Sequence, residues 1–203
     1  MVLRLTFKQS GLIALLFVVC SILAACNTLS KDECVAADWF VIGEADGTNG
    51  YDVTKRFGRH VDSCAKASIV PDQTLWSQGY QKGLRTYCTP ASGVAVGEAG
   101  KQYANVCPLD KAPRFLKAYE IGKRVYDLRR NLESKKNSIS FYQRQVSDKL
   151  SLITTLPTED QSRVQVEIAD LNAKIAVDQA ELARLSGDLA LAERDLREFK
   201  LSL

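Results

Sequence analysis

Cysteine is the residue type in this chain whose chemistry is easiest to interpret. Four of the six cysteines lie beyond the N-terminal 30 residues, at gaps of 30, 24 and 19 positions: Cys34, Cys64, Cys88 and Cys107. A structural zinc site uses short C-x₂₋₄-C spacings, commonly with histidines, and the chain has one histidine. In an oxidising compartment four cysteines pair with one another. The spacing therefore predicts two disulfide bonds and leaves three connectivities open.

The other residue types that could carry catalysis do not form a known motif. His60 is expected on a helix near Asp62, but no G-x-S-x-G motif or other identifiable nucleophile accompanies it. Asp46, Asn49 and Asp52 lack the D-x-D-x-D-G order and the twelfth-position glutamate of a calcium loop. We therefore predict no catalytic residue, no metal site, no cofactor and no enzymatic activity.

The N-terminal stretch has the layout of an export signal. Arg4 and Lys8 precede an apolar run from 11 to 19, and small residues follow in Leu23-Ala24-Ala25-Cys26. These last four residues resemble a bacterial lipobox, which predicts cleavage after residue 25 and lipidation of Cys26. A transmembrane anchor is the alternative, but the apolar stretch of about 15 residues is short of the roughly 20 that span a bilayer.

Lipidation at Cys26 would attach the mature chain to a membrane through its acyl chains. Two such chains already hold a protein stably, at about 0.8 kcal/mol per buried CH₂. Asn27 replaces the aspartate that would retain a lipoprotein at the inner membrane, which favours the outer membrane, facing the periplasm. Residues 26–33 form a spacer. Net charge is +3, with two of the cations in the signal, so nothing in the charge favours a nucleic-acid partner.

Residues 34–112 are predicted to form a small helical domain. Helical spacing of apolar residues from Cys34 to Ala45 and from 53 to 67, where Phe57, Val61 and Cys64 share a face, predicts two helices joined by a turn near residue 49. An antiparallel pair folded there brings Cys34 level with Cys64. The midpoint of Cys88 and Cys107 falls at Gly97, so we favour Cys34–Cys64 and Cys88–Cys107.

Aromatic residues precede glycines by three or four positions at several places in this domain, such as Trp39 before Gly43 and Trp76 before Gly79. Glycine weakens a helix by about 1 kcal/mol, so its repetition indicates close helix packing. The alternative is a ligand groove over bare backbone. If the domain has a ligand or partner surface, the candidate residues are Trp39, Asp46, His60, Trp76 and Tyr103.

The order of aromatic residues, glycines and cysteines in the domain also resembles a known family. The first half of the pattern is Asp38-Trp39, Ile42-Gly43, Asp46-Gly47, Gly50, His60 and Cys64. The second half is Gly79, Gly83-Leu84, Tyr87-Cys88, Gly93, Gly97, Gly100, Tyr103, Val106-Cys107-Pro108, Phe115, Tyr119 and Gly122. The pattern is similar to the domain-of-unknown-function 2799 family of bacterial envelope lipoproteins. The resemblance implies a location and a domain type, and it implies no activity.

Residues 113–203 are predicted to form an antiparallel coiled-coil hairpin. Apolar residues recur at alternating steps of three and four before and after Pro157. Thr158 begins a capping-box pattern, so the second helix should start there. Folding about residue 157 pairs Phe115 with Phe199 and Gly122 with Ala192. It also brings Lys135 near Asp178, the polar residues inside the two apolar seams, which could fix the register.

The sequence thus predicts an all-α protein, a disulfide-braced helical domain followed by a long hairpin. Apolar residues outside the seam indicate a further contact of the hairpin: Leu150, Leu152, Val166, Val177 and Leu191. We expect a structural or adaptor role, in which the hairpin binds another envelope protein or a second copy. The alternatives are a ligand-binding module with its groove in residues 34–107 and, less favoured, a cell-wall hydrolase using His60.

Overall fold

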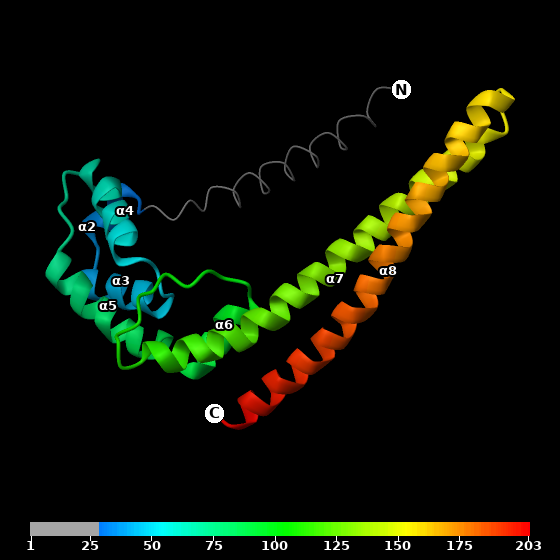
Figure 1. Cartoon of the computed structure of the whole chain (residues 1–203). Coiled ribbons are helices and arrows are strands. Elements are labelled where there is room, and N and C mark those ends of the chain that lie inside the picture. Colours follow the sequence, from blue (N-terminus) through cyan, green and yellow to red (C-terminus); the bar gives the residue numbers. More distant parts are fainter. Residues whose placement is uncertain (1–28) are drawn as a thin grey trace, which may run out of the picture.

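The computed structural model describes residues 29–203, and the regular structure in that range is helical throughout. Five short helices come first: α2 (Lys31–Val35), α3 (Trp39–Thr48), α4 (Val53–Ala65), α5 (Gln73–Tyr87) and α6 (Pro90–Glu98). Two long helices, α7 (Ala112–Ile153) and α8 (Thr158–Leu201), complete the chain. Figure 1 shows the short helices gathered at one end and the long pair projecting away from them. The predicted all-α class is confirmed.

No helix within residues 29–203 has an apolar stretch long enough to cross a membrane. Cys26 and the predicted signal at 1–25 lie outside the described residues.

Polar side chains mark where the short helices begin. The side chains of five residues each accept a hydrogen bond from a backbone N–H in the first turn of α2 to α6, respectively: Ser30, Asp38, Asp52, Asp72 and Thr89. Each cap satisfies N–H groups that have no partner inside the helix, which is worth roughly 1 kcal/mol. The cap at Asp38 separates α3 from α2, so the single helix predicted from Cys34 to Ala45 is wrong.

Helices α3 and α5 pack backbone against backbone. A Cβ atom placed on Gly43 would lie 2.0 Å from the carbonyl oxygen of Trp76, and one placed on Gly83 would lie 2.2 Å from that of Glu44. Gly47 and Gly79 are equally close to the facing helix. Any side chain at these four positions would push the helices apart, so the glycines serve close packing.

Helices α6 and α7 repeat this arrangement. Gly47 faces the carbonyl oxygen of Tyr80 and Gly97 faces that of Tyr119, at 2.1 and 2.2 Å from the built Cβ. Three of the four glycine contacts of the first pair recur in the second when 50 is added to the residue number in α3 and 39 to that in α5, whereas Ala118 takes the place that corresponds to Gly79. Gly43, Gly47 and Gly50 correspond in this way to Gly93, Gly97 and Gly100.

Tyrosine closes both pairs in the same manner. Gly50 and Gly100 have φ of +63° and +65°, and the rings of Tyr87 and Tyr126 occupy the space that a Cβ atom would need. The hydroxyls of two further tyrosines donate to the carbonyl that follows each of these glycines: Tyr80 to Tyr51 and Tyr119 to Lys101. We conclude that residues 39–126 contain two copies of one helix-pair unit, a repeat that was not recognised in the sequence.

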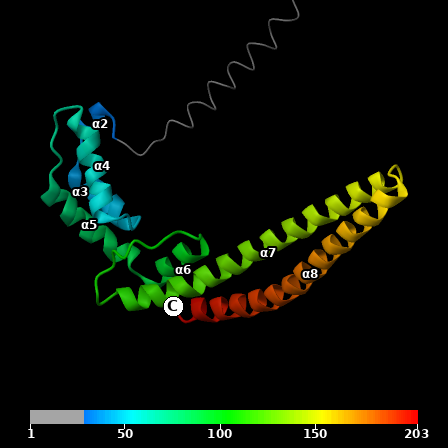
Figure 2. The same cartoon turned by 45° about the horizontal axis from the view of Figure 1, so that its top comes forward.

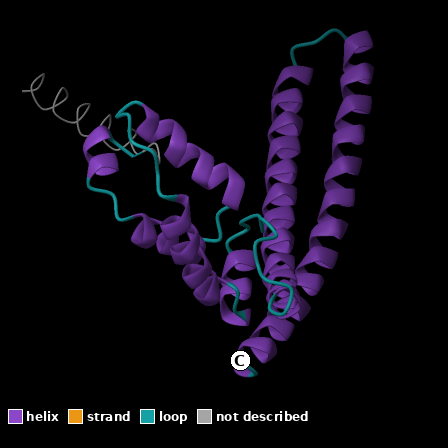
Figure 3. Ribbon diagram, turned by 90° about the vertical axis from the view of Figure 1, so that its left-hand side faces the viewer, coloured by secondary structure: helices purple, strands orange, loops and turns teal. Residues whose placement is uncertain are grey.

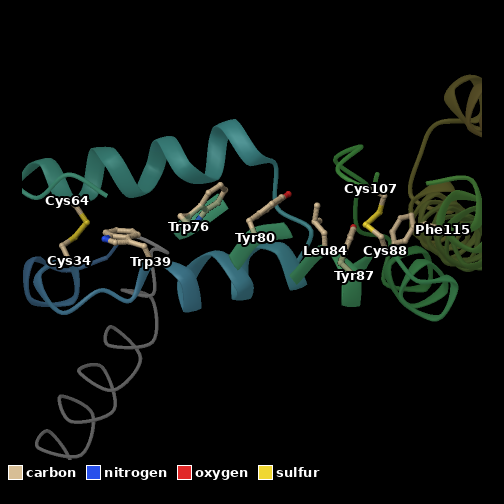
Figure 4. Packing of buried hydrophobic residues seen from close by; sticks show 10 residues of the cluster. All are labelled: Cys34, Trp39, Cys64, Trp76, Tyr80, Leu84, Tyr87, Cys88, Cys107 and Phe115. Carbon is tan, nitrogen blue, oxygen red and sulfur yellow. A yellow bond between two sulfur atoms is a disulfide. The ribbon is translucent and has the colours of Figure 1, made fainter. Parts of the chain in front are cut away.

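The structure pairs Cys34 with Cys64 and Cys88 with Cys107, the connectivity that the sequence favoured. Figure 4 shows the two bridges at opposite ends of the buried aromatic core. The first bridge joins α2 to α4, because α3 packs along α5 and not in a hairpin with α4. The expected buried face of α4 is also rotated: Val61 is 40% exposed, and His60 is buried instead.

The two long helices run side by side and meet at a turn of residues 154–157, as Figures 1 and 2 show. Their facing sides bury apolar residues from both arms, including Leu132 and Ile139 of α7 and Leu171 and Leu185 of α8. α7 carries ten basic and four acidic side chains, whereas α8 carries six basic and ten acidic ones. Opposite charge therefore adds to apolar burial in holding the arms together.

Three local predictions for the hairpin are wrong. Helix α8 begins at Thr158 as predicted, but the capping box expected there does not form, because Pro157 is the capping residue and no side chain caps the first turn. Phe115 packs against Tyr87 and Tyr103, with ring centroids 5.0 and 4.8 Å away, rather than against Phe199. Gly122 faces the backbone of α6 rather than Ala192. The last two errors share one cause, because the first turns of α7 belong to the second helix pair.

Candidate functional site

A buried carboxylate lies at the centre of the first helix pair. Asp46, on the third turn of α3, is 2% exposed. Its Oδ1 accepts a hydrogen bond from Nε of Arg56 at 2.6 Å, and its Oδ2 lies 2.7 Å from Nε2 of His60. The indole Nε1 of Trp76 also donates to Oδ2, at 3.0 Å. One carboxylate thereby links α3, α4 and α5.

Two opposing effects act on the Asp46 carboxyl. Burial favours the neutral form and raises its pKa, whereas the hydrogen bonds from His60, Trp76 and Arg56 and the positive charge of Arg56 favour the carboxylate. The second group of effects is stronger, so the pKa of Asp46 lies below its ordinary value. Asp46 is thus held as an anion, and the side chain of Arg56, 14% exposed, is its counter-ion.

Aromatic rings enclose this polar cluster. Trp39 meets the His60 ring edge-on at 5.9 Å, and Phe57 lies 5.0 Å from Trp76. Tyr80 stacks on Trp76 with ring centroids 4.9 Å apart. Figure 4 shows Trp39, Trp76 and Tyr80 in a row between the helices. With His60 3% exposed and Trp76 2% exposed, the cluster is closed to solvent.

The second helix pair has no such cluster. By the repeat offsets, Asp46 corresponds to Val96 and Trp76 corresponds to Phe115. Helix α4, which supplies Arg56 and His60, is replaced there by the loop of residues 101–111. The carboxylate and its donors are therefore a feature of the first unit alone, added to a packing scheme that the second unit keeps with apolar residues.

These geometric features coincide with a family match. Residues 38–124 match the family model described as protein of unknown function (DUF2799). The DUF2799 segment begins at the cap of α3 and ends in the first turns of α7, so it contains both helix pairs and the Asp46 cluster. The comparison with curated proteins gave no match, and neither did the comparison with solved structures.

The five residues proposed as a ligand or partner surface do not form one. Trp39, Asp46, His60 and Trp76 meet inside the first helix-pair unit, whereas Tyr103 belongs to the second unit. Its ring lies 4.8 Å from Phe115, and its hydroxyl accepts a hydrogen bond from the backbone N–H of Cys107 at 3.0 Å. Tyr103 therefore covers the loop that carries the second disulfide.

The groove expected of a ligand-binding module is filled by packed side chains. The polar tip of Trp76 has a partner, and three hollows on the surface of residues 29–203 are lined by other side chains. The Asp46–His60 pair has the carboxylate–imidazole contact of a catalytic triad, but it is buried, which counts against the hydrolase alternative. Within the described range, no group of three or more His, Cys, Asp or Glu side chains could hold a metal ion.

Arg56 is the member of the cluster that the sequence reasoning missed. It lies four residues before His60, so both side chains project from the same face of α4. That spacing, together with an aspartate in a helix of apolar and small residues, was the available signal. The chemistry of the cluster is that of a brace: one anion fixes the mutual position of three helices.

Lys135 and Asp178, the polar pair in the hairpin, meet as the sequence predicted. Nζ of Lys135 lies 2.8 Å from Oδ1 of Asp178 and 2.7 Å from Oε2 of Glu181. The hydrogen bonds to Asp178 and Glu181 raise the pKa of Lys135. A second cross-link joins Arg129 to Glu193 at 2.7 Å. Both pairs put the cation on α7 and the anion on α8, which suits one register.

Proposed function

We propose that this protein is a lipid-anchored component of the bacterial outer membrane, held on the periplasmic side by Cys26, and that it acts as an adaptor. The DUF2799 segment serves as the rigid base near the membrane. The α7–α8 hairpin serves as an arm that binds another envelope protein or a second copy of the chain.

Two features of the sequence support the anchor. The Leu23-Ala24-Ala25-Cys26 segment follows a basic and then an apolar stretch, which is the order of a lipoprotein signal. The disulfides Cys34–Cys64 and Cys88–Cys107 are of a kind that forms in exported proteins rather than in the reducing cytosol. Both features agree on an envelope location.

The observation that carries the adaptor role is the form of the hairpin. Beyond Tyr126, where the second helix pair ends, α7 continues to Ile153, so at about 1.5 Å per residue the arm reaches roughly 40 Å from the base. Near its tip, Leu150 and Leu152 are 53% and 51% exposed. A long arm that exposes leucines far from the protein's own core is suited to contact a partner.

The anchor is tested by the mass of the N-terminal peptide from purified full-length protein. We expect a peptide that begins at residue 26 with acyl chains on Cys26, and we expect Cys26→Ser to move the protein from the detergent phase to the aqueous phase. Cys20→Ser is the matched control and should leave both results unchanged. An unmodified Cys26 in the native protein would refute the anchor.

The arm is tested separately by photo-crosslinking in cells from Leu150 and Leu152. Lys136, an exposed residue on the shaft of α7, serves as the control position. We expect one envelope protein, or the chain itself, to be recovered repeatedly from the leucine positions and not from the control. Equal and scattered recovery from all three positions would contradict the adaptor role.

A further inference from the structure

Helix α8 has a second apolar face on the side opposite the one that packs on α7. Small or β-branched apolar residues recur along this face at alternating intervals of three and four positions. All are exposed in the described structure. We call this set the outer stripe: Val166, Ala169, Ala173, Ala176, Ala180, Ala183, Gly187 and Ala190. Steps of this kind produce a helix–helix seam, yet residues 29–203 contain no helix that covers it.

Gly187 gives an independent indication that another helix belongs here. Seven helical glycines of this chain lie within 2.5 Å, measured from a built Cβ, of a backbone atom of the facing helix. A Cβ atom on Gly187 would meet nothing within 4 Å, a condition that it shares only with Gly58 among the described helical glycines. Glycine weakens the middle of a long helix unless a close neighbour uses the space. Within residues 29–203 Gly187 has no such neighbour.

The outer stripe matches itself when a second copy runs antiparallel. Positions that face each other then have numbers that add to 356, so Val166 meets Ala190, Ala169 meets Gly187 and Ala176 meets Ala180. Every residue of the stripe finds another stripe residue. A self-complementary surface of this kind is what a two-fold symmetric dimer requires.

The charges beside the stripe select the same arrangement. One flank carries Asp170, Val177, Arg184 and Leu191 at seven-residue steps. On this flank the numbers of neighbouring residues add to 354, so each Asp170 lies within about 3 Å, along the helix, of being level with the second copy's Arg184, and Val177 lies beside its own counterpart next to the two-fold axis. The other flank carries only uncharged polar residues from 165 to 186, so a parallel pair would leave Asp170 and Arg184 without opposite charges. Flanking charges of this kind set partner and orientation in coiled coils.

We propose that the partner of the hairpin is a second copy of this chain, bound antiparallel through the outer stripe of α8. This inference rests on the adaptor role proposed above and names its partner. Asp170 now pairs with Lys174 at 2.7 Å and Arg184 with Asp188 at 2.8 Å, both in exposed positions. Exposed pairs of this kind are weak and can rearrange when the copies meet.

Single cysteines in the purified full-length chain test the arrangement. The cysteines at 34, 64, 88 and 107 are paired, so Val177→Cys adds a thiol that can react. Oxidation should convert the V177C protein mainly to a covalent dimer. Leu191→Cys is the matched control: in the antiparallel pair its two thiols lie about 40 Å apart, at 1.5 Å per residue, and should not cross-link.

The outcomes separate the proposals. A dimer from L191C and not from V177C would overturn the antiparallel arrangement, and absence of dimer from both would overturn self-association. A dimer in the wild-type protein as well would show that Cys20 or Cys26 has kept a free thiol, and thus that the anchor has failed. Recovery of a different envelope protein at Leu150 or Leu152, without a V177C dimer, would keep the adaptor role and refute the second copy.

A charge exchange gives a second, independent measurement. Asp170→Arg should raise the dimer dissociation constant about tenfold or more in analytical ultracentrifugation of the detergent-solubilised protein, because two like charges then meet at each end. Adding Arg184→Asp should restore most of the affinity. Both variants lie on the solvent side of α8, so the helical content of the monomer should stay unchanged. Equal dissociation constants for all three proteins would overturn the pairing.

Discussion

Substituting Asp46 by asparagine tests whether the buried carboxylate braces the three helices. Asparagine keeps the shape of the side chain but removes the charge and turns one acceptor oxygen into an N–H₂ donor. Arg56, whose side chain is 14% exposed, loses its counter-ion, and either Arg56 or His60 then faces a donor. Hydrogen bonds to a charged group contribute about 1.5–3 kcal/mol each, and removing one partner of a buried pair costs about 3–5 kcal/mol. We expect D46N to lose about 3 kcal/mol.

The pH dependence of this loss is a sharper test than its size. The pKa of Asp46 is lowered in the folded protein, so its contribution is complete above the unfolded-state pKa of about 3.9 and disappears as pH falls through the folded pKa. The difference between wild type and D46N in urea unfolding should therefore be constant from about pH 7 to pH 5 and should shrink below about pH 4.

The matched control for D46N is Asp38→Asn. Asp38 is an exposed cap whose carboxylate accepts two backbone N–H groups, and asparagine caps a helix about as well as aspartate. D38N should therefore change stability by less than about 0.5 kcal/mol. Equal stabilities for D46N and wild type at pH 7, or a difference that stays constant down to pH 2, would show that the carboxylate does not act as a brace.

Two further substitutions test the packing. Gly83→Ala puts a methyl group 2.2 Å from the carbonyl oxygen of Glu44 and should lower the free energy of unfolding in urea by about 3 kcal/mol or more. The control Gly58→Ala meets open space and should stabilise α4 by up to about 1 kcal/mol. Similar values for the two variants would contradict the backbone contact. Lys135→Asp should lower the melting temperature of the hairpin, and adding Asp178→Lys should recover roughly half of the loss. Additive losses would refute the register pair.

Much of the fold followed from local patterns in the sequence. The helical class, the start of α8 at Thr158 and the apolar seam of the hairpin each depend on patterns within a few residues, so they could be predicted directly. The disulfide connectivity was also favoured correctly, although for a hairpin of α3 and α4 that does not form. Cys34 and Cys64 meet because α2 packs on α4.

What the sequence could not give was which helix faces which. Nothing in the sequence shows that Gly122 packs against Gly97, since a small residue permits close approach to any neighbour. Numbering that was symmetric about residue 157 therefore assigned Gly122 to α8, and the structure assigns it to α6. His60 was predicted only to lie on a helix near Asp62, because nothing local shows that Asp46, 14 positions earlier, would draw it inward.

Helix α7 belongs both to the second helix pair and to the hairpin, and this determines how the molecule responds to a mechanical force. Figures 1 and 2 show α7 passing from the short helices into the projecting pair as one continuous helix, with no linker between base and arm, and Figure 3 shows the projecting pair beside the short helices from another side. Its first turns are clamped by Gly93 and Gly97, where backbone meets backbone without flexible side chains. A load applied at the tip would therefore act as torque on that clamp, so the protein would behave as a stiff lever and not as a tether.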